Sequence, residues 1–237
     1  MNADGGFTDT YDAAAVRAVA TLDDQTRRAI YAFVGAAGRP VTRAHAAHAV
    51  GISRKLAAFH LDKLVEAGLL VTRTDPARVG GTRGRSPKVY ERSPTDVTVT
   101  LPPRRPADLA EMLVEAVETA APDETARAAA MRVAEQRGCA LGAATRAQVR
   151  GGRIGAERAV SLGESVLRER GFEPARSAPT HLRLRNCPFQ PVAADAPELV
   201  CHMNHRFLTG FLAGLGTESV AAELVPRDGE CCVELRG

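Results

Sequence analysis

One stretch of this 237-residue chain, residues 42–70, constrains its fold more than any other. It reads TRAHAAHAVGISRKLAAFHLDKLVEAGLL, in which Thr42 and Ser53 each stand where a helix N-cap is preferred. Gly51 lies between the two segments, and glycine readily adopts the left-handed backbone on which a helix ends. Gly68 follows the second segment, whose apolar residues recur at helical spacing. The stretch therefore predicts two short helices joined by a tight turn.

The second predicted helix, residues 54–67, has a polar and partly basic face that stays free once its apolar residues are buried. Such a helix after a tight turn is typical of a helix-turn-helix, whose second helix enters the major groove of DNA. His60 lies at the edge of the apolar face, where packing is the expected role. The residues expected to meet DNA are Ser53, Arg54, Lys55, Ala58, Phe59 and Lys63.

Two apolar runs, residues 69–71 and 88–90, follow this helix and are joined by a segment containing glycine and proline. This pattern predicts a β-hairpin with a long tip. Arg83, Arg85 and Lys88 would place positive charge along the phosphate backbone. The sequence thus predicts a winged helix-turn-helix domain over residues 1–96.

Charge is concentrated in this part of the chain. The whole sequence has a formal net charge of +3, whereas residues 39–105 hold thirteen Lys and Arg against five Asp and Glu. A local excess of positive charge favours nucleic acid as a partner. No run approaches the ~20 apolar residues of a membrane span, and the first residues lack the layout of a signal peptide. We therefore expect a cytoplasmic protein with no membrane partner, whose five cysteines are thiols rather than disulfides.

A proline-rich segment, residues 102–106, marks the expected domain boundary. The helix predicted over residues 107–121 is expected to pair with its copy in a second subunit, so residues 97–122 form a linker and dimerisation helix. Residues 123–237 are expected to form an α+β sensor domain, which makes the whole chain α+β. In that domain we expect Gly138 to end a helix that begins at Asp123, and Cys139 to be buried.

The other four cysteines lie in the last 51 residues. Cys187 ends a predicted strand, Cys201 lies in a largely apolar helix, and Cys231 shares a strand face with Val233, whereas Cys232 is expected on the opposite face. Thiolates suit zinc or an iron–sulfur cluster, so Cys187, Cys201 and Cys231 are candidate metal ligands. Cys232 or His205 could supply a fourth ligand. The chain has no C-x-x-C pair, so buried cysteines without a ligand, or a metal-free redox pair, stay open.

The order of several motifs carries a resemblance to a known family. These are GRSPKVY in the wing, LPPR in the linker, and NCPF, VCHMN and G-x-CCV in the C-terminal half. With them the chain resembles bacterial ArsR-like winged helix-turn-helix transcriptional regulators, and is similar to the repressors of Suf operons. That resemblance implies a homodimer whose cysteines hold an iron–sulfur cluster. Those repressors carry a further cysteine between the positions of Cys201 and Cys231, and this chain has none there. Zinc, a cluster with a non-cysteine ligand, and a pocket for a small organic molecule therefore remain alternatives.

The sequence as a whole predicts a homodimeric, sequence-specific DNA-binding regulator of transcription. A two-fold dimer would bind an inverted-repeat operator with half-sites about 34 Å apart. In the alternative, the C-terminal domain binds a small organic ligand and its cysteines are structural. Cys201 and His205 stand four residues apart, but no third activating group or phosphate-binding loop accompanies them, so we expect no enzymatic activity. A constitutive DNA-binding architectural protein is a third class.

Overall fold

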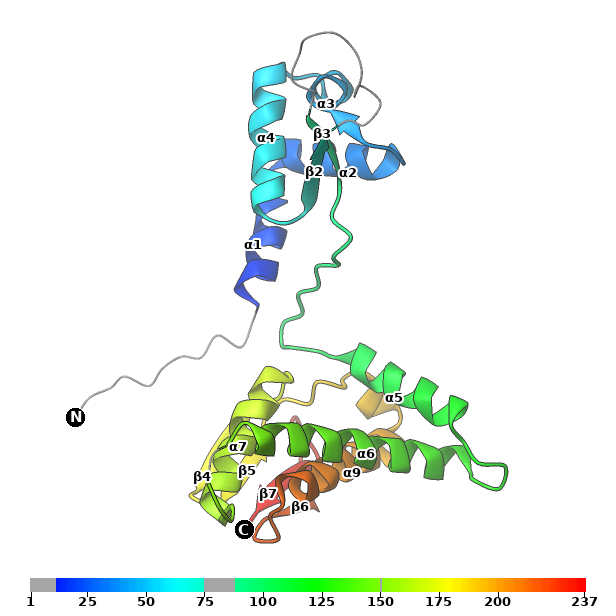
Figure 1. Ribbon diagram of the computed structural model, residues 1–237, viewed down its shortest axis with the longest axis vertical. Helices are drawn as coiled ribbons and strands as arrows, with labels where there is room; N and C mark the ends of the chain where they lie inside the picture. Colours follow the sequence, from blue (N-terminus) through cyan, green and yellow to red (C-terminus); the bar gives the residue numbers. More distant parts are fainter. Residues whose placement is uncertain (1–11, 75–87, 150) are drawn as a thin grey trace, which may run out of the picture. The chain divides into compact units, whose positions relative to one another are not determined.

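The computed structural model describes residues 12–74, 88–149 and 151–237 (Figure 1). The chain divides between Val99 and Thr100 into two compact units. Helices and an antiparallel sheet occur in both units, which confirms the predicted α+β class. Among the described residues, no helix is long and apolar enough to cross a membrane.

In residues 12–74 and 88–99, the first unit packs four helices against a small sheet. Its three strands are antiparallel in the order β1-β3-β2, and the core between sheet and helices includes Ile30, Leu61, Leu64 and Tyr90. The elements are α1 (Ala13–Thr21), α2 (Gln25–Ala36), β1 (Val41–Thr42), α3 (Arg43–Val50), α4 (Arg54–Glu66), β2 (Leu70–Thr74) and β3 (Lys88–Arg92).

Local signals in the sequence set the ends of α3 and α4. The Thr42 hydroxyl accepts a hydrogen bond from the amide of His45 at 3.3 Å, and the Ser53 hydroxyl accepts one from the amide of Leu56 at 3.2 Å. Gly51 has a φ of 71°, the left-handed conformation that ends α3. The predicted pair of helices and the hairpin β2–β3 are both present.

The second unit packs helices on a four-stranded antiparallel sheet in the order β4-β5-β7-β6. Two long helices, α6 and α9, lie side by side (Figure 1). The elements are α5 (Pro106–Glu118), α6 (Ala126–Ala147), α7 (Ala156–Glu169), β4 (Pro174–Ala178), β5 (His181–Leu184), α8 (Val192–Asp195), α9 (Pro197–Leu215), β6 (Ala221–Leu224) and β7 (Val233–Arg236).

The helix expected to end at Gly138 instead runs on to Ala147, so that prediction was wrong. Gly138 lies where α6 touches the backbone of α9, and a Cβ there would overlap the carbonyl oxygen of Phe207. On α9, a Cβ at Gly210 would overlap the carbonyl oxygen of Glu135. Glycine is therefore present because the two backbones approach closely, not because the helix ends. Since the helix continues, Cys139 falls on its outer face and is exposed, contrary to expectation.

The helix expected to pair with a second subunit, α5, belongs to the second unit. Its buried residues Leu109, Met112 and Ala116 join the same core as α6 and α9. The segment 97–122 thus falls partly in each unit, with the division at residue 99. One face of α5 is used within its own unit, which leaves the opposite face free for another role.

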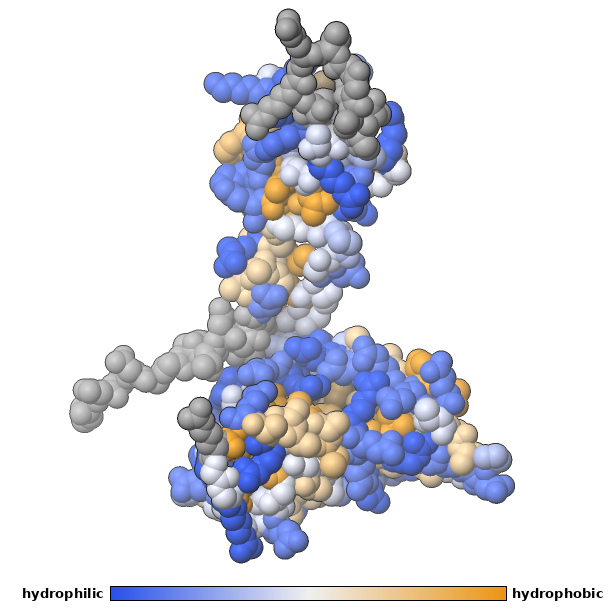
Figure 2. Space-filling view, in the orientation of Figure 1, coloured by the Kyte–Doolittle hydropathy of each residue, from blue (hydrophilic) through white to orange (hydrophobic). Residues whose placement is uncertain are grey.

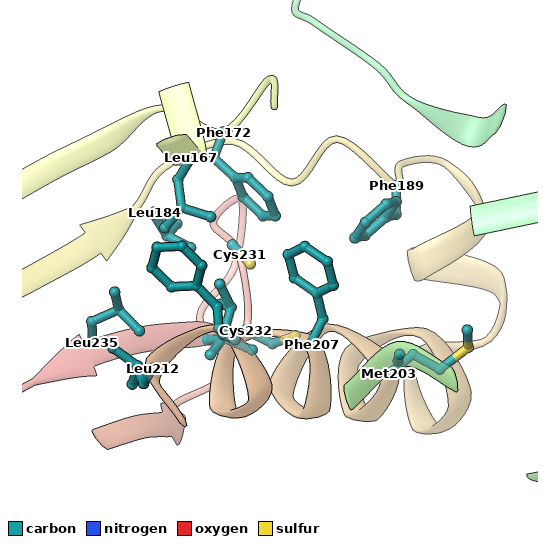
Figure 3. Packing of buried hydrophobic residues seen from close by; sticks show 14 of the residues in the cluster. Leu167, Phe172, Leu184, Phe189, Met203, Phe207, Leu212, Cys231, Cys232 and Leu235 are labelled. Atoms are coloured by element: carbon teal, nitrogen blue, oxygen red, sulfur yellow. The ribbon is translucent and has the colours of Figure 1, made fainter. Parts of the chain in front are cut away.

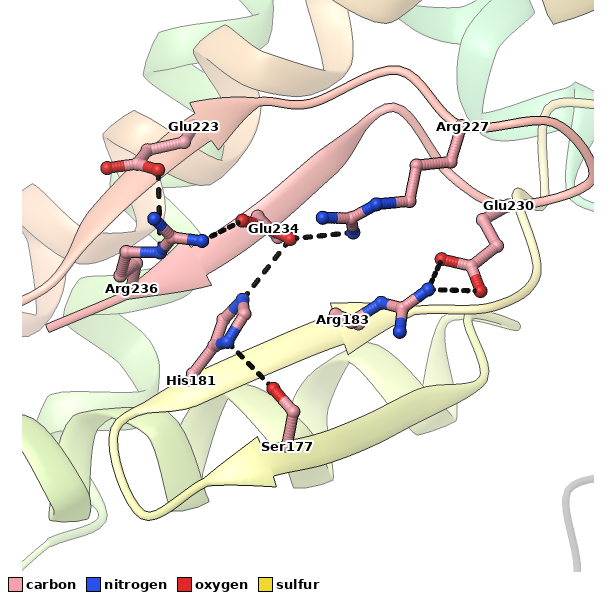
Figure 4. A network of polar contacts seen from close by, with 8 residues as sticks. All are labelled: Ser177, His181, Arg183, Glu223, Arg227, Glu230, Glu234 and Arg236. Atoms are coloured by element: carbon pink, nitrogen blue, oxygen red, sulfur yellow. Dashed lines mark hydrogen bonds and ion pairs between the residues drawn. The ribbon is translucent and has the colours of Figure 1, made fainter.

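A buried carboxylate, Glu234 on β7, links this strand to β5 and to the loop that precedes β7 (Figure 4). Its side chain is 2% exposed and lies 2.9 Å from the Arg227 guanidinium, 2.8 Å from that of Arg236 and 3.2 Å from Nε2 of His181. Burial raises the pKa of Glu234, but the hydrogen bonds and the charges of Arg227 and His181 together outweigh burial, so that this pKa lies below its ordinary value. The folded protein therefore favours the ionised form of Glu234.

Glu234 should make the stability of the protein depend on pH on the acid side. Because its pKa is lower in the folded state than in the unfolded state, its contribution is present above the unfolded pKa of about 4.3 and is lost as pH falls. Glu234→Gln should lower the urea midpoint at neutral pH, and the difference from the wild type should shrink towards about pH 3. Glu218→Gln, at an exposed carboxylate of the same unit, is the control. An equal difference at both pH values would contradict this role.

Candidate functional site

The helix predicted to read DNA, α4, buries one face and presents the other to solvent. Ala57, His60, Leu61 and Leu64 are buried, so His60 is a packed residue, with Nδ1 4.0 Å from a carboxylate oxygen of Asp24. The predicted DNA-contacting residues lie at the start of the helix and on its outer face. Of these, Ser53, Arg54, Lys55, Phe59 and Lys63 are exposed and Ala58 is partly buried.

Two large apolar side chains stand out on this outer face. Leu56 is 42% exposed and Phe59 is 52% exposed. Leu56 was not among the predicted contacts, although its place in the first turn of the helix is visible in the sequence. Apolar side chains in the major groove contact the thymine methyl group, so a protein surface with this character suits base reading.

The described part of the wing, residues 70–74 and 88–92, carries both free and paired cations. Lys88 is exposed at the start of β3, but Arg73 pairs with Glu91 at 3.1 Å, and Arg92 lies over the Tyr31 ring, 4.8 Å from its centroid. The other two predicted wing contacts, Arg83 and Arg85, lie outside the described residues. Lys88 is thus the predicted wing contact that the structure places.

The second unit brings four cysteines together from three parts of the chain. Cys187 follows β5, Cys201 lies on α9, and Cys231 and Cys232 directly precede β7. The thiol of Cys187 lies close enough to that of Cys231, and the thiol of Cys232 close enough to those of Cys231 and Cys201, to shift one another's pKa values. Figure 3 shows Cys231 and Cys232 among the aliphatic and aromatic side chains of the core. We call these residues the cysteine cluster.

Cys232 does not point away from the core as predicted. Strand β7 begins only at Val233, so the alternation of faces along a strand does not apply to residues 231 and 232. Both side chains are buried, at 5% exposed for Cys231 and 9% for Cys232. Cys232 is therefore a member of the cluster, although the sequence predicts it on the opposite face of the strand.

Hydrogen bonds within the cluster move its pKa values in opposite directions. The hydrogen bond from Cys231 lowers the pKa of Cys187, and the same residue is the main cause that lowers the pKa of Cys232 to about 7. The pKa of Cys231 is raised, chiefly by its bond to Cys187, and burial raises the pKa of Cys201 to about 12. At Cys187 and Cys232 the lowered pKa eases loss of the thiol proton, and the thiolate is the form that soft metals bind.

A buried amide adjoins the cluster. Asn204 is 2% exposed, and its Nδ2 donates a hydrogen bond to Sγ of Cys231 at 3.2 Å. Its Oδ1 has no hydrogen-bond partner among the described residues, which is uncommon for a buried polar atom. The sequence does not predict this role for Asn204, because its contact with Cys231 joins residues 27 positions apart.

His205 is held away from the cysteines. Its Nε2 donates to the carbonyl oxygen of Ala222 at 3.0 Å, so Cys232 is the better fourth member of the cluster. The raised pKa of Cys201 also works against a thiolate–imidazole nucleophile on α9. Within the described part of the chain, no group of three or more His, Cys, Asp or Glu side chains is already set out as the ligands of a metal ion.

The first residues of the second unit are fastened to the loop that carries Cys187. The Arg104 guanidinium donates to Oδ1 of Asn186 and to the carbonyl oxygen of Cys187, both at 2.6 Å. Asn186 in turn donates from Nδ2 to the carbonyl oxygen of Pro103 at 3.0 Å, and the Arg105 amide donates to the carbonyl oxygen of Pro188 at 2.8 Å. We call this set of bonds the linker clamp.

Comparison with known proteins bears on the first unit. Residues 22–73, which include α2, α3, α4 and most of β2, match a family described as helix-turn-helix domain. A search of curated proteins finds no match for this chain. The match identifies residues 22–73 as a helix-turn-helix domain, which is a DNA-binding unit in regulators of transcription.

Proposed function

We propose that the protein is a homodimeric regulator of transcription that binds an inverted-repeat operator through α4. We further propose that its cysteine cluster responds to a soft metal ion, an iron–sulfur cluster or a change of redox state. The observation that carries the DNA-binding part is the outer face of α4 within the matched helix-turn-helix domain. Its first turn places Arg54 and Lys55 at the positive end of the helix. Phosphates and base edges are met there in proteins of this type.

The free face of α5 supports the homodimer. Ala107, Ala110, Val114 and Val117 are exposed and follow one another at intervals of three and four residues. Val114 is 57% exposed and Val117 is 75% exposed, and Figure 2 shows apolar surface over this helix. Spacing of this kind lines the seam along which two helices pack in a coiled coil. A second copy of α5 is therefore the partner that we propose for this face.

The cysteine cluster supports the sensing part. Four sulfurs form a donor set that suits a soft metal, and Asn204 offers a hydrogen bond to one of them, as residues around a metal's ligands commonly do. We propose Cys187, Cys201 and Cys231 as ligands, with Cys232 as the fourth. A bound iron–sulfur cluster would supply sensitivity to oxidants, and zinc would supply a structural link.

The linker clamp gives the sensing site a route to the first unit. Arg104 bonds directly to the carbonyl oxygen of Cys187, so a change in the backbone at Cys187 alters the anchoring of residues 103–105. These residues follow directly after the segment that joins the two units. We propose that the state of the cysteines changes DNA affinity through this connection, as a coupling between two sites.

Arg54→Ala tests the DNA-binding part. The loss of one charge-assisted contact at the start of α4 should weaken binding to the selected operator by about tenfold or more at fixed salt. Fluorescence anisotropy with a labelled inverted repeat and a single half-site measures the affinity and the preference for two half-sites. Arg185→Ala, which removes an exposed arginine of the second unit, is the matched control. Unchanged affinity of the Arg54 variant would remove α4 from the interface.

A further inference from the structure

A pocket of about 400 Å³ opens on the second unit between α5, α6 and α9. Its interior is aromatic, because Phe172, Phe189 and Phe207 come together there from three parts of the chain. These residues are 1%, 7% and 8% exposed, so only a small part of Phe189 and of Phe207 reaches the open space, and the rings of Phe172 and Phe189 meet edge to face at 6.1 Å between centroids. Figure 3 shows the side chains of Phe172, Phe189 and Phe207 on the same side of α9. The volume lies within the range of sites that hold small molecules.

Arg170 and Asp108 line this pocket as an ion pair without a short hydrogen bond between them. A guanidinium nitrogen of Arg170 lies 3.7 Å from a carboxylate oxygen of Asp108, which is too far for a good hydrogen bond, and the two side chains are 39% and 31% exposed. Within the described residues, neither side chain makes another hydrogen bond. The guanidinium also lies 5.9 Å from the centroid of the Phe207 ring.

The second arginine of the pocket, Arg137, already has short hydrogen bonds to carboxylates. Arg137 donates to Glu115 at 2.6 Å and to Glu111 at 3.1 Å, so its guanidinium is already occupied. Arg170 and Asp108 are thus one cation and one anion, side by side, that can each accept a partner. A lone carboxylate bound at Arg170 would face the charge of Asp108, and a lone ammonium at Asp108 would face Arg170. A group that carries both charges meets both residues.

We propose that this pocket binds a small aromatic zwitterion of the amino-acid class. Its carboxylate would pair with Arg170, its ammonium with Asp108, and its ring would pack beside the accessible edges of Phe189 and Phe207. Charge-assisted hydrogen bonds give the head group its selectivity, and burial of the ring gives most of the affinity. The proposal does not depend on DNA binding or on a metal at the cysteine cluster.

The place of the pocket gives the ligand a structural effect. Asp108 lies on α5, Phe207 on α9, and Phe189 two residues after Cys187. A molecule that contacts all three residues joins α5 to the elements that carry two of the clustered cysteines. Ligand binding should therefore raise the stability of the second unit, and the gain should grow with the logarithm of the free ligand concentration once this exceeds the Kd.

Methyl NMR of the full-length protein tests the proposal with simple probes. The chain has four methionines, and Met112 lines the pocket, so its labelled methyl group reports binding while Met131 and Met203 serve as internal references. L-phenylalanine should shift the Met112 signal saturably. 3-Phenylpropionate and phenethylamine, which each lack one charge, should bind about tenfold more weakly. L-alanine, which lacks the ring, should cause no saturable shift.

Variants of the charged pair test the assigned contacts. Arg170→Gln should weaken L-phenylalanine binding about tenfold, and Asp108→Asn should do the same if the first variant folds poorly. Arg183 does not line the pocket and pairs with Glu230 at a distance of 2.6 Å, so Arg183→Gln should leave L-phenylalanine binding unchanged. The proposal is overturned if L-phenylalanine gives no saturable shift at tens of millimolar. Equal affinity for 3-phenylpropionate, or unchanged affinity of both variants, would overturn it as well.

Discussion

Replacing Gly138 by alanine is expected to destabilise the second unit by about 3 kcal/mol, the upper part of the range for overpacked cores. The new Cβ would overlap the carbonyl oxygen of Phe207 and come close to the amide of Phe211, both backbone atoms of α9. A backbone cannot move aside as a flexible side chain can, so α6 and α9 must separate. Separation costs contacts along the longest helix pair of this unit.

The sign of this result separates packing from helix propensity. In an open helix, alanine in place of glycine stabilises by about 1 kcal/mol, so a large loss at Gly138 can come only from the close contact. Urea unfolding followed by circular dichroism gives the size of the loss, and hydrogen exchange of α6 and α9 peptides gives its location. Gly152→Ala is the matched control, because a Cβ there meets nothing within 4 Å. A Gly138 variant as stable as the wild type would show that the helices can move apart freely.

The sequence predicts the first unit well because its determinants are local. Ser53 caps α4 three residues from the amide that it binds, and Gly51 ends α3 through its own backbone. Both signals are read from neighbouring residues, so the two helices follow from the pattern without knowledge of what they pack against. The exposure of Leu56 is different, since it depends on which face the rest of the unit covers.

The second unit is predicted less well because distant contacts decide it. Gly138 reads as a helix end in isolation and is instead the point where α6 meets α9, 69 positions further on at Phe207. Cys232 reads as outward because the strand was expected to include it, whereas β7 begins one residue later. The pairing of Arg104 with Asn186 spans 82 positions and leaves no periodic trace. The sequence nevertheless groups Cys187, Cys201 and Cys231, and all three interact with Cys232 in the structure.

Replacing Cys231 by serine is expected to lower the affinity of the second unit for a soft metal probe by about a hundredfold or more. Groups that only hydrogen-bond a metal ligand cost up to about a hundredfold in metal affinity when they are removed, and loss of the ligand itself should cost at least as much. Cys231 has hydrogen-bond contacts with Cys187 and Cys232 and is the most buried of the four, so its loss removes the centre of the donor set. Titration of the reduced protein with cadmium, followed by the thiolate-to-metal absorption, measures the affinity. Because thiols must lose protons to bind metal, the affinity should also fall as pH is lowered.

Two further variants give this experiment a graded outcome. Asn204→Ala removes the hydrogen bond to Sγ of Cys231 but no sulfur, so cadmium affinity should fall by about tenfold, as for other groups that support metal ligands. Cys139→Ser removes an exposed thiol of α6 and should leave the affinity unchanged, although it changes the same atom as the Cys231 variant. If cadmium binds equally well to all three variants, the four sulfurs are a packed core and not a binding site. A metal site in the cysteine cluster requires that the loss of cadmium affinity is largest for the Cys231 variant, smaller for the Asn204 variant and absent for the Cys139 variant.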